Sequence, residues 1–315
     1  MEKGRVINLN GGVYKVLLEN GNVVSVKARG KLRRVEMVIA NEKSLSNKKE
    51  IAYIKNSPKV GDLVNVSGEF IDSYEPRKNE LVRPSIANVD QIILVFAATE
   101  PKLSYYLLDL FICMVVKNKI NPVIVITKID LLSDDELKEL KTNMNYYQGL
   151  GYDVLYVDSL NKSGIDDVEK ILNNKISILS GQTGAGKSTL INAIIPDFSL
   201  KTQEISQSLG RGKHTTRETS LYIHNNCYIG DTPGFSKIDE LLLDGANLDT
   251  LFVDFKSCNC QFSDCNHMPN IKGCGVYNKY LDGTILKSRY ENYVKMYKEI
   301  NRKWNFHFLF WQLII

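Results

Sequence analysis

A glycine-rich stretch with the sequence GQTGAGKS at residues 181–188 has the spacing of a phosphate-binding loop. It follows an apolar run and precedes an amphipathic pattern, so a strand should lead into the loop and a helix should leave it. Glycines let backbone N–H groups converge on phosphates at a helix N-terminus, where partial positive charge favours an anion. Lys187 should reach the β and γ phosphates, and Ser188 should be a ligand of Mg²⁺. The residues predicted to bind the triphosphate are Gly181, Gln182, Thr183, Gly184, Ala185, Gly186, Lys187, Ser188 and Thr189.

A second polar stretch, Thr127-Lys128-Ile129-Asp130, also follows an apolar run, and it resembles the N/T-K-x-D signature with which GTPases read guanine. An aspartate here accepts hydrogen bonds from N1–H and the 2-amino group of guanine, a donor pair that adenine lacks. Asp130 therefore disfavours an enzyme that uses ATP. Thr127 stands where asparagine is commoner and should lose amide contacts to the phosphate loop and the purine, which predicts modest nucleotide affinity. Ser159 lies in a loop expected to donate backbone N–H groups to guanine O6.

Two further segments could sense the γ-phosphate. Asp231-Thr-Pro-Gly234 matches the D-x-x-G element, which contacts Mg²⁺ through water, so Asp231 and Gly234 are predicted GTP-binding residues. Between this element and the phosphate loop, the stretch GRGKHTTRET offers a threonine that would cap the metal. Thr216 is our first choice as the second Mg²⁺ ligand, and Thr215 is the alternative.

The elements that must position these residues form an alternating pattern from about residue 91. Apolar runs are expected to be strands at 92–97, 123–126, 154–157 and 176–179, and helices are expected at 103–116, 134–147 and 165–172. Continuous apolar strands separated by helices indicate a doubly wound α/β domain with a parallel sheet. The base-reading stretch precedes the phosphate loop, whereas ordinary GTPases place it last. Because cutting a parallel sheet at one loop leaves strand neighbours unchanged, the order indicates a circularly permuted P-loop GTPase.

The region before this domain predicts a small β-barrel of the OB type. Short alternating runs at 13–17, 23–26, 36–39, 51–54 and 63–66 are separated by turn signals. Five cations fall within residues 27–34, which are either a solvated loop or a contact to a phosphate backbone. The polar, proline-containing stretch 74–90 is expected to be a linker. We predict three domains, at residues 1–72, 73–238 and 239–315.

The last region carries four of the six cysteines of the chain, namely Cys258, Cys260, Cys265 and Cys274, which favours a metal over disulfides. Helical periodicity resumes at about 281–304, so this domain should be small and mainly helical. A formal charge of +4 is only mildly basic, so any nucleic-acid role must depend on local patches. We find no secretory signal and no apolar run long enough for a membrane helix, and we expect a cytoplasmic protein. The apolar end after Trp304 is either packed against the core or a peripheral contact.

The barrel, the permuted motif order and the cysteine cluster together resemble the RsgA (YjeQ) family of GTPases that act with the small ribosomal subunit. The resemblance covers residues 1 to about 300 and implies late maturation of the 30S subunit, binding of 16S rRNA, and GTP hydrolysis stimulated by the ribosome. Phe235 stands where many GTPases carry a water-orienting glutamine. The resemblance implies that His214 supplies this function. The alternative is an RNA-binding assembly factor that uses GTP and GDP mainly as a conformational latch.

The same resemblance implies cofactors and partners. They are Mg²⁺ with GTP, one structural Zn²⁺, and the 30S subunit, with no membrane and a monomeric protein. Cys258 could replace Cys260 as a ligand, but the family spacing favours Cys260. The zinc ligands implied are Cys260, Cys265, His267 and Cys274.

Overall fold

The structure, a computed structural model, describes residues 1–33, 35–39, 50–54, 57–81, 85–195, 220–231 and 248–312. The chain divides into two compact units. The first consists of Met1–Asp90, Asn174–Ile178 and Lys213–Gly234, and the second of Gln91–Asn173, Leu179–Gly212 and Phe235–Ile315. The three domain boundaries expected from the sequence remain a prediction.

A closed five-stranded barrel forms the N-terminal part of the first unit. Its strands are β1 (Glu2–Asn10), β2 (Val13–Leu18), β3 (Val23–Ala28), β6 (Leu63–Ser67) and β7 (Phe70–Tyr74). They pair in the order β1-β2-β3-β7-β6, and β6 pairs back onto β1. β3 and β7 run parallel, and every other pair is antiparallel. Alternate residues point inward, and Val6, Val16, Val26, Val64 and Ile71 are almost fully buried. This is the predicted OB-type barrel.

Two of the strands expected for this barrel lie outside it. β4 (Val35–Ile39) and β5 (Glu50–Ile54) pair with each other in a separate antiparallel ribbon. The barrel instead uses β1 and β7, which the sequence pattern missed. β1 opens with charged residues and β7 is half polar, so neither reads as a clear apolar alternation.

The stretch 74–90 packs on the barrel and is not the free linker that its polarity predicted. Arg77 donates two hydrogen bonds to the buried carboxylate of Asp62, from Nε to Oδ1 at 2.9 Å and from Nη2 to Oδ2 at 2.7 Å. Two short strands, β8 (Glu80–Leu81) and β9 (Ile86–Ala87), pair with each other, and Ile86 is fully buried. A half-buried arginine that is paired with a fully buried carboxylate therefore fixes this segment.

The first unit also contains the start of β13 (Ile176–Gly181). It runs parallel to β15 (Cys227–Asp231), with Ile178 opposite Gly230. β14 (Ser220–His224) pairs antiparallel with β15. β14 also meets β1, where the Asn8 amide donates to the hydroxyl of Ser220 at 2.7 Å.

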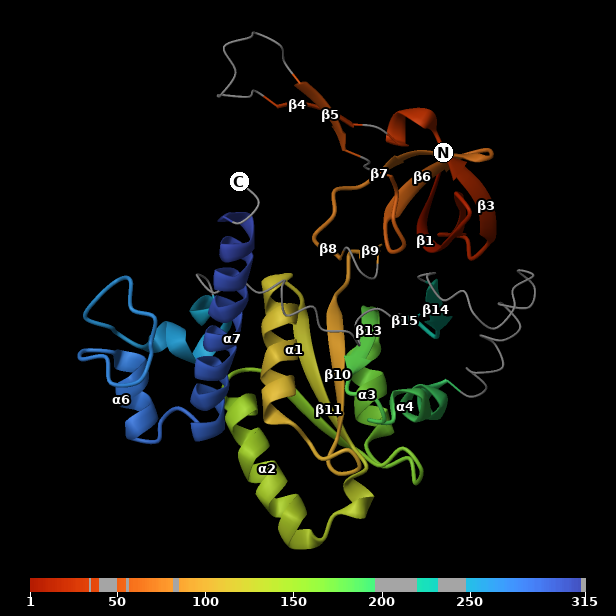
Figure 1. The fold of residues 1–315 in the computed structure, drawn as a ribbon. Coiled ribbons are helices and arrows are strands. Elements are labelled where there is room, and N and C mark those ends of the chain that lie inside the picture. Colours follow the sequence, from red (N-terminus) through yellow and green to blue (C-terminus); the bar gives the residue numbers. More distant parts are fainter. Residues whose placement is uncertain are drawn as a thin grey trace. The chain divides into compact units, whose positions relative to one another are not determined.

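The second unit contains the α/β arrangement predicted from the sequence. β10 (Gln91–Ala97), β11 (Asn121–Thr127) and β12 (Asp153–Val157) pair in parallel, and β10 is buried along its whole length. Figure 1 shows α1 (Tyr105–Lys117) and α2 (Asp134–Gly149) on one side of the strands, with α3 (Ile165–Leu172) and α4 (Lys187–Ile194) on the other. Ser104 caps α1, and Ser133 forms a capping box with Glu136 at the start of α2.

The C-terminal region shares its hydrophobic core with α1. It contains two short 3₁₀ helices, η5 (Asp249–Leu251) and η6 (Val253–Ser257), and the helices α6 (Gly275–Leu281) and α7 (Lys287–Gln312). Leu110 and Cys113 of α1 pack in one cluster with Phe252, Tyr293 and Met296. In the part of the chain that the structure describes, no helix is both long and apolar enough to span a membrane.

A buried charge cluster lies between α1 and α7. Arg289 of α7 is fully buried and donates to Asp109 of α1 at 2.5 Å and to Asp254 of η6 at 3.1 Å. Asp109 also accepts hydrogen bonds from Tyr147 of α2 at 2.9 Å and from Asn292 of α7 at 2.7 Å. This cluster therefore links α7 to both helices on that side of the sheet.

Candidate nucleotide site and metal centre

The phosphate loop connects β13 to α4, as the sequence predicted. Gly181 ends β13 with φ of +131°, and a Cβ atom there would lie 2.0 Å from the carbonyl oxygen of Val95. Only glycine fits this close approach. Gly186 precedes α4 with φ of +80°, and no side chain among the described residues caps that helix. The first N–H groups of α4 can therefore donate to phosphate.

The side chain of Lys187 forms hydrogen bonds within the phosphate loop. Its Nζ atom donates to the carbonyl oxygens of Gly181 at 2.9 Å and Gln182 at 2.7 Å. Partial burial lowers the pKa of Lys187 by desolvation. A phosphate that replaced these carbonyls would give the ammonium group a charged partner in place of neutral ones.

Thr127 joins the base-reading stretch to the phosphate loop. Its side chain is buried, and its hydroxyl donates to the carbonyl oxygen of Ala185 at 2.7 Å. The hydroxyl therefore gives the base-reading stretch a direct bond to the phosphate loop, although the amide contacts of an asparagine are absent. The predicted modest affinity remains a prediction.

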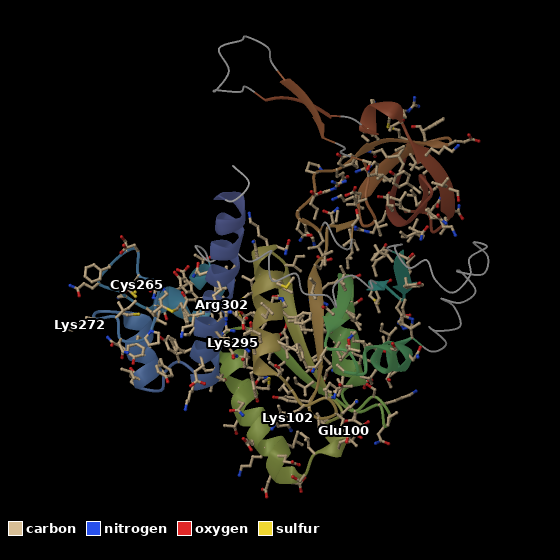
Figure 2. All side chains as sticks on the ribbon, in the orientation of Figure 1. Glu100, Lys102, Cys265, Lys272, Lys295 and Arg302 are labelled. Atoms are coloured by element: carbon tan, nitrogen blue, oxygen red, sulfur yellow. The ribbon has the colours of Figure 1, made fainter. Side chains whose placement is uncertain are left out.

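Lys128 has a left-handed backbone, with φ of +58°, and its Nζ atom donates to the carbonyl oxygen of Glu100. Glu100 and Lys102 lie in the loop that follows β10 (Figure 2). Pro101 of the same loop lies 3.5 Å from the Cβ position of Gly184, so this loop borders both predicted motifs.

One pocket brings the base-reading stretch and the phosphate loop together. The carboxyl ends of β11, β12 and β13 lead into its walls, which is where open α/β sheets bind ligands. Six of the predicted site residues line it, together with three others that the motifs did not include. Its lining residues are Thr127, Lys128, Asp130, Leu131, Asp158, Ser159, Leu160, Gly186 and Thr189.

Two carboxylates line this pocket, and their surroundings differ. Asp158 accepts hydrogen bonds from the backbone N–H groups of Leu160 at 3.0 Å and Asn161 at 3.1 Å, and from the Asn161 amide at 2.5 Å. Desolvation opposes ionisation of Asp158, but these hydrogen bonds outweigh it and lower its pKa. Asp130 is exposed, and no described residue donates a hydrogen bond to its carboxylate. The carboxylate of Asp130 can therefore accept hydrogen bonds from a ligand, whereas the carboxylate of Asp158 is already bonded within its own turn.

Sequence reasoning missed two leucines of this pocket. Leu131 is 52% exposed and Leu160 is 78% exposed, although both side chains are large and apolar. A flat aromatic ligand between them would remove apolar surface from water. The only sequence signal is their position beside Asp130 and Ser159, since a leucine usually indicates core. The Ser159 hydroxyl is buried and has no partner among the described residues.

The remaining predicted site residues are only partly described. Thr183, Gly184 and Ser188 are at the surface of the loop and the start of α4, and Asp231 ends β15. Those that lie outside the described residues are His214, Thr215, Thr216 and Gly234.

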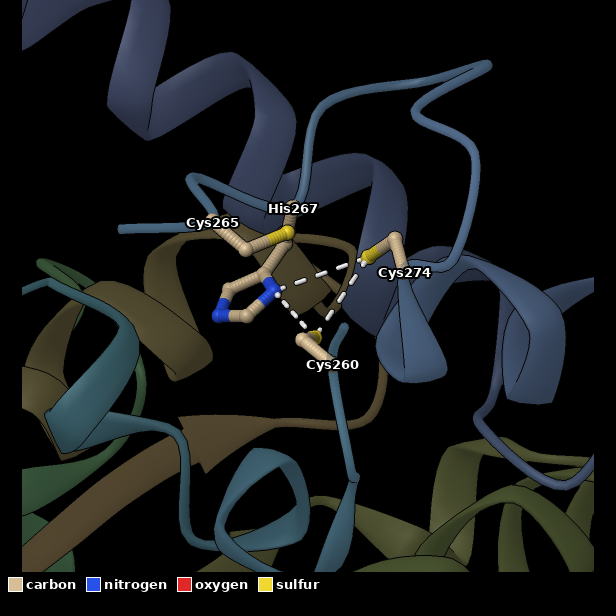
Figure 3. Close-up of side chains that lie close together, drawn as sticks. All are labelled: Cys260, Cys265, His267 and Cys274. Carbon is tan, nitrogen blue, oxygen red and sulfur yellow. Dashed lines mark hydrogen bonds between the residues drawn. The ribbon is translucent and has the colours of Figure 1, made fainter. Parts of the chain in front are cut away.

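A second cluster contains the four residues that the family spacing favoured as zinc ligands. Cys260, Cys265, His267 and Cys274 place their ligand atoms within 4.8 Å of one another (Figure 3). Nδ1 of His267 lies 3.4 Å from Sγ of Cys260 and 3.6 Å from Sγ of Cys274, and the two sulfurs are 3.9 Å apart. A tetrahedral zinc with Zn–S bonds of about 2.3 Å and Zn–N bonds of about 2.0 Å separates its ligand atoms by roughly 3.5–3.8 Å. The observed spacing therefore fits zinc.

The chemistry of these thiols also favours a cation. Burial, with a smaller contribution from the nearby thiols of Cys265 and Cys260, raises the pKa of Cys274 to about 12. Thiolates this close repel one another unless a metal lies between them. Cys258 is not in the cluster, and its Sγ atom instead donates to the carbonyl oxygen of Asp254 at 3.5 Å.

Comparisons with known proteins agree with this geometry. A family model described as RsgA GTPase matches residues 74–241. A protein from Phytoplasma australiense named small ribosomal subunit biogenesis GTPase RsgA is 42% identical over 312 residues, covering 96% of this chain and 98% of that protein. A protein of the same name from Halalkalibacterium halodurans is 37% identical over 307 residues, covering 95% and 97%.

Two solved structures are similar over nearly the whole chain. The crystal structure of YjeQ from Thermotoga maritima has a TM-score of 0.76 and 33% identity, and the match covers 95% of this chain and 98% of that one. YloQ, described as a circularly permuted GTPase, has a TM-score of 0.75 and 30% identity, and the match covers 96% and 95%.

Proposed function

The chain belongs to the RsgA GTPase family, and we propose on this basis that its GTP hydrolysis serves the late maturation of the 30S ribosomal subunit. The observation that carries the proposal is a pocket lined by Asp130 together with Gly186 and Thr189, since these residues come from the two motifs that occur in permuted order. The names of the relatives supply the particle on which it acts.

Residues of the pocket and of the neighbouring motifs divide the work of binding GTP in this proposal. Asp130 accepts from N1–H and the 2-amino group of guanine, Lys128 and the two leucines cover the base, and Ser159 lies where the loop meets O6. Lys187 exchanges its carbonyl partners for the β and γ phosphates. Ser188 and Thr216 hold Mg²⁺, and Asp231 and Gly234 respond to the γ-phosphate.

His214 is proposed to orient the attacking water. Phe235 occupies the place of the glutamine that does this in many GTPases, and a phenyl ring offers no donor or acceptor. A histidine can accept a proton from water, and the stimulated rate would depend on the 30S particle bringing it into place.

One structural Zn²⁺ is proposed at Cys260, Cys265, His267 and Cys274. Four protein ligands close a tetrahedral site, so the metal supplies folding energy and no catalytic water. Bound there, it would join the loop carrying Cys260 to the start of α6, where Cys274 caps the helix.

The barrel is the proposed contact to 16S rRNA. Lys27 and Lys31 are exposed, whereas Arg29 forms an ion pair with Asp72 and lies 5.5 Å from the ring of Phe70. The exposed lysines suit a phosphate backbone. We propose that the protein works as a cytoplasmic monomer, apart from membranes, with functions divided among the predicted domains at 1–72, 73–238 and 239–315.

Single-turnover GTP hydrolysis with and without purified 30S subunits tests the proposal. We expect a slow rate for the free protein and a large stimulation by the particle. The variant His214→Ala should keep GTP and 30S binding, measured by co-sedimentation in a non-hydrolysable GTP analogue, and should lose the stimulation. Absent stimulation of the unaltered protein, with nucleotide-dependent binding intact, would instead indicate a conformational latch.

A further inference from the structure

The two ring nitrogens of His267 face different groups. Nδ1 faces the sulfurs of Cys260 and Cys274, and Figure 3 shows the other nitrogen on the opposite side of the ring. That second nitrogen, Nε2, lies 3.8 Å from Oδ2 of Asp249. Within the described part of the chain, Asp249 is the only acidic or basic residue that pairs with this ring.

The surrounding residues hold the histidine in this orientation. Its ring packs edge-on against Phe255 at 5.6 Å, and the Tyr290 hydroxyl donates to its carbonyl oxygen at 2.9 Å. Tyr293 lies on another side of the ring at 6.1 Å. These contacts hold the backbone and the ring of His267 in place, and Asp249 is the group that faces its Nε2 atom.

The backbone of Asp249 is held in place, while its side chain is 38% exposed. It opens η5, and its two neighbours in the core, Leu248 and Phe252, are fully buried. The backbone N–H of Phe252 donates to the carbonyl oxygen of Asp249 at 3.1 Å. Its carboxylate would need to move about 1 Å to reach a hydrogen-bonding distance of about 2.8 Å.

We infer that Asp249 is a positioning residue of the metal centre, which accepts the Nε2–H of His267 and thereby directs the Nδ1 lone pair at the metal. A histidine that binds a metal through one nitrogen carries its proton on the other, and a carboxylate on that N–H fixes the tautomer and raises the basicity of the ligand. The inference depends on the proposed zinc site but is separable from it. Loss of such a partner typically weakens metal binding 10- to 100-fold.

The zinc affinity of the full-length protein, measured by competition with a chromophoric chelator, tests this role. We expect Asp249→Ala to bind zinc about 10- to 100-fold more weakly than the unaltered protein. Asp249→Asn keeps an oxygen acceptor and should therefore lose less zinc affinity than Asp249→Ala. The control is Asp264→Ala, which removes an exposed carboxylate next to Cys265 and should leave the affinity unchanged.

Two further measurements separate positioning from general stability. The absorption spectrum of the Co²⁺ form should shift in Asp249→Ala, whereas the stability of the metal-free protein should not change. Equal zinc affinity for Asp249→Ala and the unaltered protein would overturn the inference, as would an equal loss in Asp264→Ala. Failure of the unaltered protein to bind zinc at all would instead refute the proposed metal site itself.

Discussion

Replacement of Arg289 by methionine removes the one cation of the charge cluster between α1 and α7. The guanidinium group is fully buried, and it bonds Asp109 through Nη1 and Asp254 through Nε and Nη2. It also lies 4.5 Å from the ring of Phe252. Methionine fills a similar volume without the charge, so the change isolates the electrostatic loss from the packing.

The size of the stability loss depends on the hydrogen bonds that Asp109 and Asp254 keep in the variant. Asp109 keeps two neutral donors, Tyr147 and Asn292, and Asp254 keeps the hydroxyl of Tyr146 at 2.9 Å. Two carboxylates are then buried with no positive partner. Removing one partner of a buried pair costs about 3–5 kcal/mol. At an m-value of about 2 kcal/mol/M, this lowers the urea midpoint by roughly 1.5–2.5 M.

Intrinsic fluorescence can follow this transition. Both tryptophans of the chain, Trp304 and Trp311, lie in α7, so their emission reports on the helix that Arg289 anchors. The control is Arg302→Met, because Arg302 is exposed on the same helix (Figure 2). We expect the control to change stability by less than about 0.5 kcal/mol.

The loss should also depend on pH. Burial raises the pKa of Asp109, and Arg289 acts against that rise, so removing Arg289 raises the pKa further. The unfolded carboxyl titrates near 3.9, and between that value and its raised native pKa the variant loses stability as the pH rises. The deficit should therefore be smaller at pH 5 than at pH 8. A midpoint shift no larger than that of Arg302→Met, at either pH, would refute the anchoring role of the cluster.

Three other changes test the nucleotide site. Asp130→Asn should shift preference from guanine toward xanthine nucleotides in competition binding, and unaltered guanine selectivity would count against the assigned base reader. Leu160→Ala should weaken GDP binding about fivefold, since roughly 1 kcal/mol of apolar contact is lost. The matched control is Leu281→Ala, because Leu281 is 64% exposed and lies outside the pocket. Equal GDP affinities for the two variants would contradict a contact between Leu160 and the nucleotide. Gly181→Ala should abolish GTP binding in equilibrium dialysis, because its Cβ would lie 2.0 Å from the Val95 carbonyl oxygen, and retained binding would show that the loop can relax.

Motif spacing predicted which two stretches of the chain lie together. The phosphate loop and the base-reading stretch lie at the carboxyl ends of strands and line one pocket, as their residue types required. The two leucines were not predictable, because an exposed leucine and a core leucine look alike in sequence. The bond from Thr127 to Ala185 also needed coordinates, since it depends on where a hydroxyl lies after folding.

The fold was predictable where strands are continuous and apolar, as in β10 and β11. It was less so in the barrel, where charged residues mask the alternation of β1. The stretch 74–90 shows the same limit, because its polarity suggested a linker and only the ion pair of Arg77 with the buried Asp62 reveals why it is fixed. Likewise, sequence alone could not show that the C-terminal region shares its core with α1.

The bond between Thr127 and Ala185 has a consequence for synthesis. Its two ends are 58 residues apart, and the purine-reading half is made first. A growing chain that has completed β11 and β12 carries the proposed base-reading residues before residues 181–189 of the phosphate loop are made. Nucleotide capture must therefore wait for the glycine loop and α4 to emerge. Under the roles proposed above, the chain must be translated past residue 189, beyond its midpoint, before both motifs can bind GTP.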